Sequence, residues 1–213
     1  MTEHPEPPAL APDGPTDGRR ARTRGRGTRE EILETALVLF GSVGYHTASL
    51  REIASRVGIS HPGLLHHFAN KAALLEAVLE RRDAVDDAAL QADLADGVGY
   101  LDALVRLVER NASRPGIVEL FATLSAEATS PDHPAHAYFV RRYAITLAQI
   151  TDAFLELREA GRLRDDVEPA SAARRLVAVM DGLQVQWLLE AGSPTRVDMA
   201  DEVRTHYLAY LLG

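Results

Sequence analysis

The sequence predicts an all-α protein, and three observations lead to this prediction. Apolar side chains recur at intervals of three and four residues in every periodic segment, which is the spacing of one helix face. Strict alternation of apolar and polar residues, as in a half-buried strand, is not found. Turn signals separate the periodic segments at Pro115, Gly116, Pro131, Gly161 and Pro194. We expect an N-terminal three-helix unit followed by a larger helical domain.

Residues 1–24 are expected to form a disordered tail. The first 18 residues contain five prolines and almost no large apolar side chain, so burial cannot offset the entropy lost on ordering them. Residues 19–29 then interleave six arginines with Gly, Thr and Ala. An isolated run of this kind is as often a solvated basic linker as a binding element.

The first helix is expected to begin at Thr28 and to stop at Gly44. Its apolar positions are Ile32, Ala36, Leu37, Phe40 and Val43. A second helix follows Ser49, which forms a capping box with Glu52 three residues later, and it ends at Gly58. Its apolar face consists of Leu50, Ile53, Ala54 and Val57.

The third helix is expected to be very short. Ser60 caps it, and Pro62 lies in its first turn, where a missing N–H costs nothing. Leu64 and Phe68 face inward, and Asn70 caps a fourth helix. The apolar positions of the fourth helix are Leu74, Leu75, Val78 and Leu79. Further helices are expected near 100–112, 116–129, 134–160, 170–190 and 198–212.

The composition excludes several classes of protein. The chain has no cysteine, so disulfides, thiolate metal sites and cysteine nucleophiles are excluded. It has no apolar run of 18 residues and no signal-peptide pattern, so we expect a cytoplasmic protein without a membrane partner. Sequence motifs of an enzyme, such as a phosphate loop, G-x-S-x-G or H-E-x-x-H, are missing, and no carboxylate pair is convincing.

The charge is unevenly distributed along the chain. A net charge of -8 argues at first sight against a nucleic-acid partner, because phosphate contact needs clustered Lys and Arg. Residues 19–82, however, carry 11 basic and 6 acidic side chains, whereas residues 83–213 carry 12 and 21. A positive segment joined to an acidic body indicates a DNA-contacting module beside a domain that stays off the DNA.

Residues 49–68 predict a helix-turn-helix, in which two helices are joined by a turn that starts with glycine. Such pairs also occur in enzymes as packing units. The outer face of the short third helix of the chain, which is the second helix of this pair, favours DNA recognition. This face consists of His61, Gly63, Leu65, His66 and His67. Imidazoles bond phosphates or base edges, and an apolar side chain can contact a thymine methyl group in the major groove.

Residues 47–74, TASLREIASRVGISHPGLLHHFANKAAL, resemble the signature of the TetR family of transcriptional regulators over its whole length. This resemblance implies an all-helical homodimer without a cofactor. Residues 25–85 would form its helix-turn-helix domain on double-stranded DNA. Residues 86–213 would form its helical domain for binding a small-molecule effector and the partner subunit.

The resemblance also implies individual DNA contacts. Backbone or groove-edge contacts fall on Thr47, Ser49 and Arg51, and the reading surface comprises Ser60, His61, Pro62, Gly63, Leu65, His66 and His67. Lys71 would hold a phosphate at the start of the fourth helix. Arg24 and Arg26 would lie on phosphates or in a minor groove. Leu65 replaces the tyrosine of most members, so we expect direct readout mainly from His61 and His66.

The C-terminal part resembles a BetI-like subgroup of this family at residues 115–127, 133–139 and 180–187. It implies a four-helix bundle across the dimer, built by the last two helices. Their apolar faces are Leu176, Val179, Leu183 and Trp187, then Val203, Tyr207 and Leu211, with ordinary core as the alternative. Candidates for an effector cavity are Phe121, Leu124, Tyr138, Tyr143, Met180 and Trp187, each of which packing would also explain.

Two further features have alternative interpretations. His133 and His136 are three residues apart, but no third ligand is evident, so we expect no metal site. Glu127 either meets a cationic effector or faces water. The sequence therefore predicts a bacterial repressor that an effector releases from a palindromic operator. An effector-independent regulator or activator is the alternative, and an enzyme with an ancillary helix-turn-helix is a distant one.

Overall fold

The computed structural model describes residues 17–212, with side chains described from residue 27, and within this range the chain forms nine helices and no strand. The all-α class is confirmed. The helices are α1 (Asp17–Thr47), α2 (Leu50–Val57), α3 (His61–His67), α4 (Lys71–Ala95), α5 (Tyr100–Ala112), α6 (Pro115–Glu127), α7 (His136–Glu159), α8 (Pro169–Leu189) and α9 (Met199–Leu208). None of the described helices is long and apolar enough to cross a membrane.

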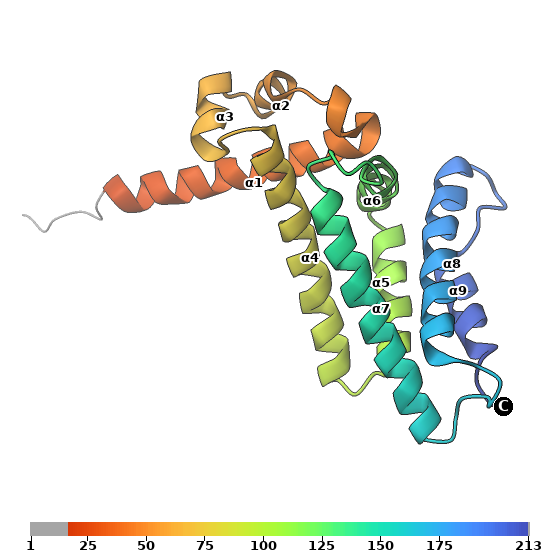
Figure 1. Cartoon of the computed structure of the whole chain (residues 1–213). Coiled ribbons are helices and arrows are strands. Elements are labelled where there is room, and N and C mark those ends of the chain that lie inside the picture. Colours follow the sequence, from red (N-terminus) through yellow and green to blue (C-terminus); the bar gives the residue numbers. More distant parts are fainter. Residues whose placement is uncertain (1–16, 213) are drawn as a thin grey trace, which may run out of the picture.

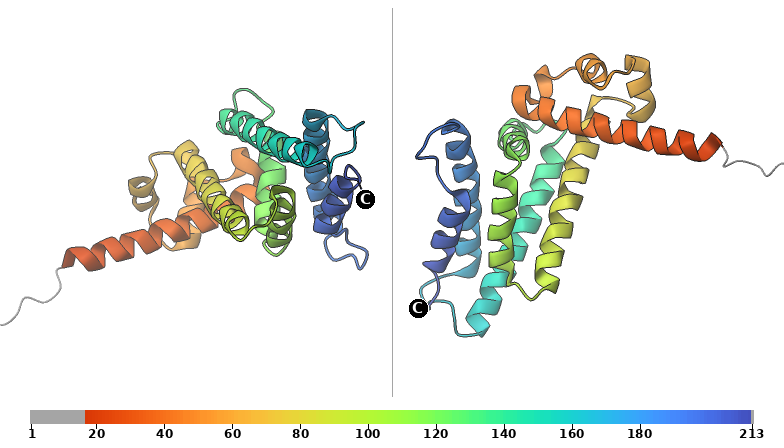
Figure 2. Two further views of the ribbon diagram at one scale, coloured as in Figure 1. Left: turned by 90° about the horizontal axis from the view of Figure 1, so that it is seen from below. Right: turned by 180° about the vertical axis from the view of Figure 1, so that it is seen from behind.

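The helices form a small unit on top of a bundle (Figure 1). Helices α1, α2 and α3 gather at one end, and α4 runs from that end down into the bundle. Helices α5, α7, α8 and α9 lie alongside it, while α6 lies across the top of the bundle beneath α1. The view from behind shows the same two layers, with α3 far from the end of α9 (Figure 2).

Helix α1 begins at Asp17, eleven residues before the expected start at Thr28. The prediction relied on an apolar face, but Arg and Ala favour a helix without one. The part of the expected tail that falls at residues 17–24 is therefore helical, while the expected disorder of residues 1–16 lies outside the described residues. Val43, expected to face inward, is 41% exposed, whereas Phe40, about one turn earlier, is fully buried.

The N-terminal unit and the bundle share one apolar core. Phe40 of α1, Leu64 of α3 and Leu74 of α4 belong to the same buried cluster as Leu120 of α6 and Phe139 of α7. The boundary expected at residues 85 and 86 falls inside the continuous helix α4. The two units are consequently packed together, and no linker separates them.

A close crossing of α1 and α6 holds these units together. A β-carbon added at Gly41 would lie 2.9 Å from the backbone nitrogen of Leu120, closer than such atoms approach in proteins. At Gly44, α1 bends at φ 76° and ψ 169°, and the N–H of Tyr45 donates to the Glu127 carboxylate at 2.8 Å. Glu127 therefore serves neither of its expected roles, since it binds the backbone that the bend exposes.

The second core lies between α5, α7, α8 and α9. It contains most of the apolar positions predicted to face a partner subunit, namely Leu176, Leu183, Trp187, Val203 and Tyr207. Val179 and Leu211 pack against it half-buried. These residues form ordinary core, because α8 and α9 turn their apolar faces towards α5 and α7 of the same subunit. Exposed apolar side chains occur instead at Val140, Ile145 and Leu155 of α7 and at Val185 and Leu189 of α8.

The crossing gives a stability prediction for Gly41. Replacing Gly41 by Val should lower the free energy of unfolding by about 1–3 kcal/mol, because the added carbons must displace the backbone of α6. Urea denaturation of the purified protein measures this change. The matched control is Gly27→Ala, at a helical position with nothing within 4 Å, which should leave stability equal or slightly higher. Equal midpoints for Gly41→Val and the unchanged protein would contradict the close crossing.

Candidate DNA interface and effector cavity

Side-chain caps fix the geometry of the helix-turn-helix. The Ser49 hydroxyl accepts the N–H of Arg51 at 3.3 Å at the start of α2. The Ser60 hydroxyl accepts the N–H of Gly63 at 3.1 Å at the start of α3. Between these caps Gly58 adopts φ 76° and ψ 26°, a left-handed conformation that suits glycine and ends α2. The expected caps and the glycine stop are confirmed.

One part of the predicted capping box is wrong. Glu52 does not return to the backbone at Ser49, and its carboxylate instead binds the Arg56 guanidinium one turn later at 2.7 Å. Both side chains are about half exposed, with 46% for Glu52 and 50% for Arg56. An ion pair of this exposure contributes little to stability.

The expected reading face of α3 lies on the surface. Leu64 and Phe68 are buried, as predicted. The other residues of α3 remain accessible: Pro62, Leu65 and His66 are exposed, and His61, Gly63 and His67 are half-buried. Thr47, Ser49 and Arg51 are exposed at the adjoining start of α2. The orientation of these residues suits DNA contact, while the contacts themselves stay a prediction.

The N-terminal arginines lie in α1. The side chains of Arg24 and Arg26 are outside the described residues, so their expected contacts have no structural account here. Arg29 follows them, and its guanidinium lies 4.9 Å from the centre of the Phe68 ring at the end of α3. This contact places Arg29, the last arginine of the basic segment, at the end of the reading helix. The contact could not be predicted from the sequence, because the two residues are distant in the chain.

Lys71 has a bracing role that the sequence did not indicate. Its ammonium donates to the carbonyl oxygens of Ala48 at 2.7 Å and His46 at 3.1 Å, and it lies 4.5 Å from the centre of the Tyr45 ring. Partial burial lowers the pKa of Lys71, and the nearby charge of Glu127 opposes this shift. The ammonium thus joins α4 to the turn between α1 and α2, and phosphate binding by Lys71 stays a prediction.

The histidines considered as metal ligands are used in local packing. His133 is buried against the rings of Tyr45 and His46, and its Nδ1 accepts the N–H of Ala135 at 3.1 Å. Burial is the main cause of its lowered pKa, which Glu127 opposes. The Nδ1 of His136 lies 2.8 Å from the carbonyl oxygen of Ala128. Among the described residues, no three potential metal ligands gather at one place.

A cavity opens between α4, α5, α6, α7, α8 and α9, with about 90 Å³ available to the centres of water molecules. Three of the six predicted effector residues line it, namely Phe121, Tyr143 and Met180. The other three lie elsewhere. Leu124 is fully buried in the first core, the Tyr138 hydroxyl donates to Asp83, and Trp187 lies in the second core beneath the guanidinium of Arg196.

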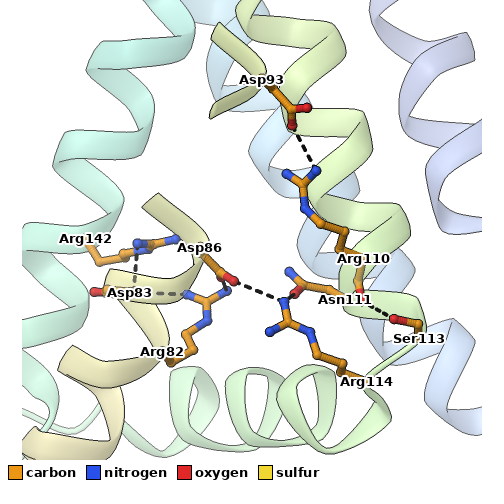
Figure 3. Close-up of polar contacts among 9 residues, drawn as sticks. All are labelled: Arg82, Asp83, Asp86, Asp93, Arg110, Asn111, Ser113, Arg114 and Arg142. Carbon is orange, nitrogen blue, oxygen red and sulfur yellow. Dashed lines mark hydrogen bonds and ion pairs between the residues drawn. The ribbon is translucent and has the colours of Figure 1, made fainter. Parts of the chain in front are cut away.

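A cluster of ion pairs (Figure 3) lies beside this cavity, and two of its side chains, Arg82 and Arg142, line the cavity. Arg82 binds Asp86 at 3.0 Å and Asp83 at 3.3 Å, all within α4. Arg142 of α7 binds Asp83 at 2.8 Å, and Arg114 binds Asp86 at 3.3 Å. The spacing of Arg82 and Asp86 is visible in the sequence as a helical pair, but their burial depends on how α4 packs.

A further polar group that lines the cavity is Asp181 of α8. Its carboxylate accepts a hydrogen bond from the Tyr143 hydroxyl at 2.8 Å, and both residues line the cavity. Burial raises the pKa of Asp181, with the bond from Tyr143 opposing the shift. Tyr143 was predicted from its aromatic ring, whereas Asp181 has no local sequence signal and was not predicted.

Two family models match the chain. Residues 32–78 match the model described as bacterial regulatory proteins of the tetR family. Residues 100–213 match the model described as the C-terminal part of BetI-type transcriptional repressors. The second match alone covers more than half of the chain. Both agree with the arrangement of a helix-turn-helix on a helical bundle.

Curated relatives extend the likeness over most of the chain. The HTH-type transcriptional repressor KstR2 of Rhodococcus jostii is 28% identical over 206 residues, covering 87% of this chain and 90% of the relative. The HTH-type transcriptional regulator TtgR of Pseudomonas putida is 28% identical over 195 residues, with the same shares.

Solved structures share the fold. Salmonella enterica GusR superposes with a TM-score of 0.66 at 26% identity, over 87% of this chain and 95% of that one. A transcriptional regulator from Saccharomonospora viridis in complex with choline reaches a TM-score of 0.73 at 24% identity, over 88% and 99%. At that identity the second likeness concerns the fold alone.

The contacts of Lys71 give a prediction that needs no DNA. Replacing Lys71 by Met should lower the free energy of unfolding by about 1–2 kcal/mol, because two carbonyl oxygens lose a charged donor. Urea denaturation checks this value. Arg56→Met serves as control, since its half-exposed ion pair should contribute less than about 0.5 kcal/mol. If Lys71 served phosphate binding alone, Lys71→Met would unfold at the same urea concentration as the unchanged protein.

Proposed function

The chain belongs to the TetR family of transcriptional regulators, and on this premise we propose that it is a homodimeric repressor that a small effector releases from a palindromic operator. The observation that carries the proposal is the shared core, which connects an exposed reading helix to the helices around a cavity. A ligand and a DNA site would thereby act on one packed structure. Neither ligand binding nor DNA binding needs a catalytic group.

DNA reading is assigned to α3. A helix of this kind enters the major groove with its first residues against the base edges. The exposed His66 and the half-buried His61 offer hydrogen bonds, and Leu65 offers an apolar contact. Pro62 and Gly63 place little side-chain bulk at the start of α3, which favours close approach of the helix to the bases. Arg29 holds the arginine-rich part of α1 beside this face, where it suits phosphate contact.

Dimerisation is assigned to the outer faces of α7 and α8. These two helices pack against each other and carry Ile145, Leu155, Val185 and Leu189 exposed. A second copy would cover these side chains and present two reading helices to successive turns of the duplex, about 34 Å apart. Such a dimer recognises an inverted repeat, because its own symmetry matches that of the site.

Effector release is assigned to α6. Phe121 of α6 lines the cavity, and the same helix touches α1 at Gly41 and binds the Tyr45 N–H through Glu127. A ligand that displaces α6 would therefore shift α1 and the helices on it. A coupling free energy of about 1–3 kcal/mol between cavity and DNA would change operator occupancy several-fold.

Selection of bound duplexes from a random pool tests DNA reading. We expect an inverted repeat, and His66→Ala should weaken the preference at particular base pairs by about 1–3 kcal/mol. His206→Ala is the matched control, because His206 lies on α9, remote from α3. The absence of any enriched sequence at low salt would refute the repressor proposal. Equal losses for His66→Ala on selected and random DNA would refute base readout by His66.

A paired substitution tests the dimer face. Val185→Glu should produce monomers with reduced operator affinity, because a carboxylate would be buried between the subunits. Analytical ultracentrifugation reports the oligomeric state. Val85→Glu on α4 is the control, since Val85 is 47% exposed and Val185 49%. Dimers that tolerate Val185→Glu as well as Val85→Glu would show that the subunits meet elsewhere.

A further inference from the structure

The ion pairs beside the cavity are arranged so that their positive groups face it. Arg82 and Arg142 line the cavity, whereas their partners Asp83 and Asp86 do not. With Arg114, the cluster holds three guanidinium groups and two carboxylates. One positive charge is in excess, and the side of the cluster towards the cavity is cationic.

The Arg82 side chain has an unused donor. Arg82 is only 8% exposed, and its Nε is buried without a hydrogen-bond partner. A buried donor in this condition costs free energy, which an acceptor would recover. Since Arg82 lines the cavity, a ligand there can reach the guanidinium. The side-chain amide of Asn111 also lines the cavity, and its oxygen is bound by Arg114, which leaves its NH₂ as a further donor.

We propose that the cavity binds a small organic acid, with its carboxylate at Arg82 and Arg142 and its apolar body between α5, α6 and α8. This inference rests on the proposed function in taking the cavity as the effector site. Guanidinium groups bind carboxylates with two parallel hydrogen bonds, which gives both strength and orientation. The remaining wall is largely apolar, including Leu104, Val118 and Val177.

The same groups disfavour a cationic ligand. Within the described structure, Asp181 is the acid that lines the cavity, and its carboxylate already accepts the Tyr143 hydroxyl. Partial burial raises the pKa of Asp181, so this carboxyl holds a proton at higher pH than an ordinary aspartate. Quaternary ammonium groups bind over aromatic faces, but at Phe121 such a group would meet a like charge, because the guanidinium of Arg82 lies 4.6 Å from the centre of the ring.

The cavity volume limits the size of the acid. Holding one water molecule takes about 10–15 Å³ on this measure, so 90 Å³ accommodates several. We therefore use benzoate and hexanoate, small acids with one carboxylate and a short apolar body, as probes. Asp181 and Tyr143 also line the cavity and are available to bond a second polar group of a ligand.

The test compares acids with their neutral amides on the full-length protein. Benzoate and hexanoate should raise the melting temperature and give saturable heats of binding, whereas benzamide, hexanamide and choline should not. Arg142→Gln should weaken benzoate binding about tenfold or more, because a charged donor is lost, and Arg142→Lys should recover part of it. Arg141→Gln is the matched control, since Arg141 is the exposed neighbour that does not line the cavity.

Three results would overturn the inference: no binding of either acid, equal binding of acid and amide, or stabilisation by choline instead. The comparison of acids with amides on the unchanged protein tests the inference even if Arg142→Gln does not fold. Operator binding is measured on the same preparation without ligand. A protein that binds its operator but no acid fails this inference alone, whereas one that binds no DNA fails the proposed function and leaves the calorimetric comparison valid.

Discussion

Helix α1 crosses α6 with almost no space between their backbones, since at Gly41 even a β-carbon would collide with the backbone at Leu120. Three residues further on, Gly44 bends α1 and the Glu127 carboxylate of α6 accepts the freed N–H of Tyr45. These contacts place the helix-turn-helix on the bundle. The position of the α3 surface, the bracing by Lys71 and the proposed coupling between cavity and DNA all depend on this crossing.

Local structure could be predicted from the sequence because its causes lie within a few residues. Ser60 caps α3 through an N–H three residues away, and Gly58 ends α2 through its own backbone conformation. The inward positions of Leu64 and Phe68 follow from helical spacing. The fold class, the short third helix and the succession of helices along the chain were therefore predictable.

Contacts between distant segments could not be predicted in the same way. A carboxylate such as Glu127 has no local sign that its partner is a backbone N–H 82 residues away. The apolar faces of α8 and α9 were correctly found, yet spacing does not say whether Leu176 meets its own subunit or another. The cavity shows the same limit, because aromatic type selected Phe121 and Tyr143 but overlooked Arg82, whose charge suggested the surface.

The shared core also bears on how such proteins can be recombined. A chimera that joins residues 27–85 to the body of another relative would set Gly41 and Gly44 against a foreign α6. The chimera would keep Gly41, which allows the close approach to any α6 backbone, but without a carboxylate at the position of Glu127 the N–H of Tyr45 would lose its acceptor. We therefore expect residues 27–85 to dock on a foreign body only where the residue that corresponds to Glu127 is transferred with them.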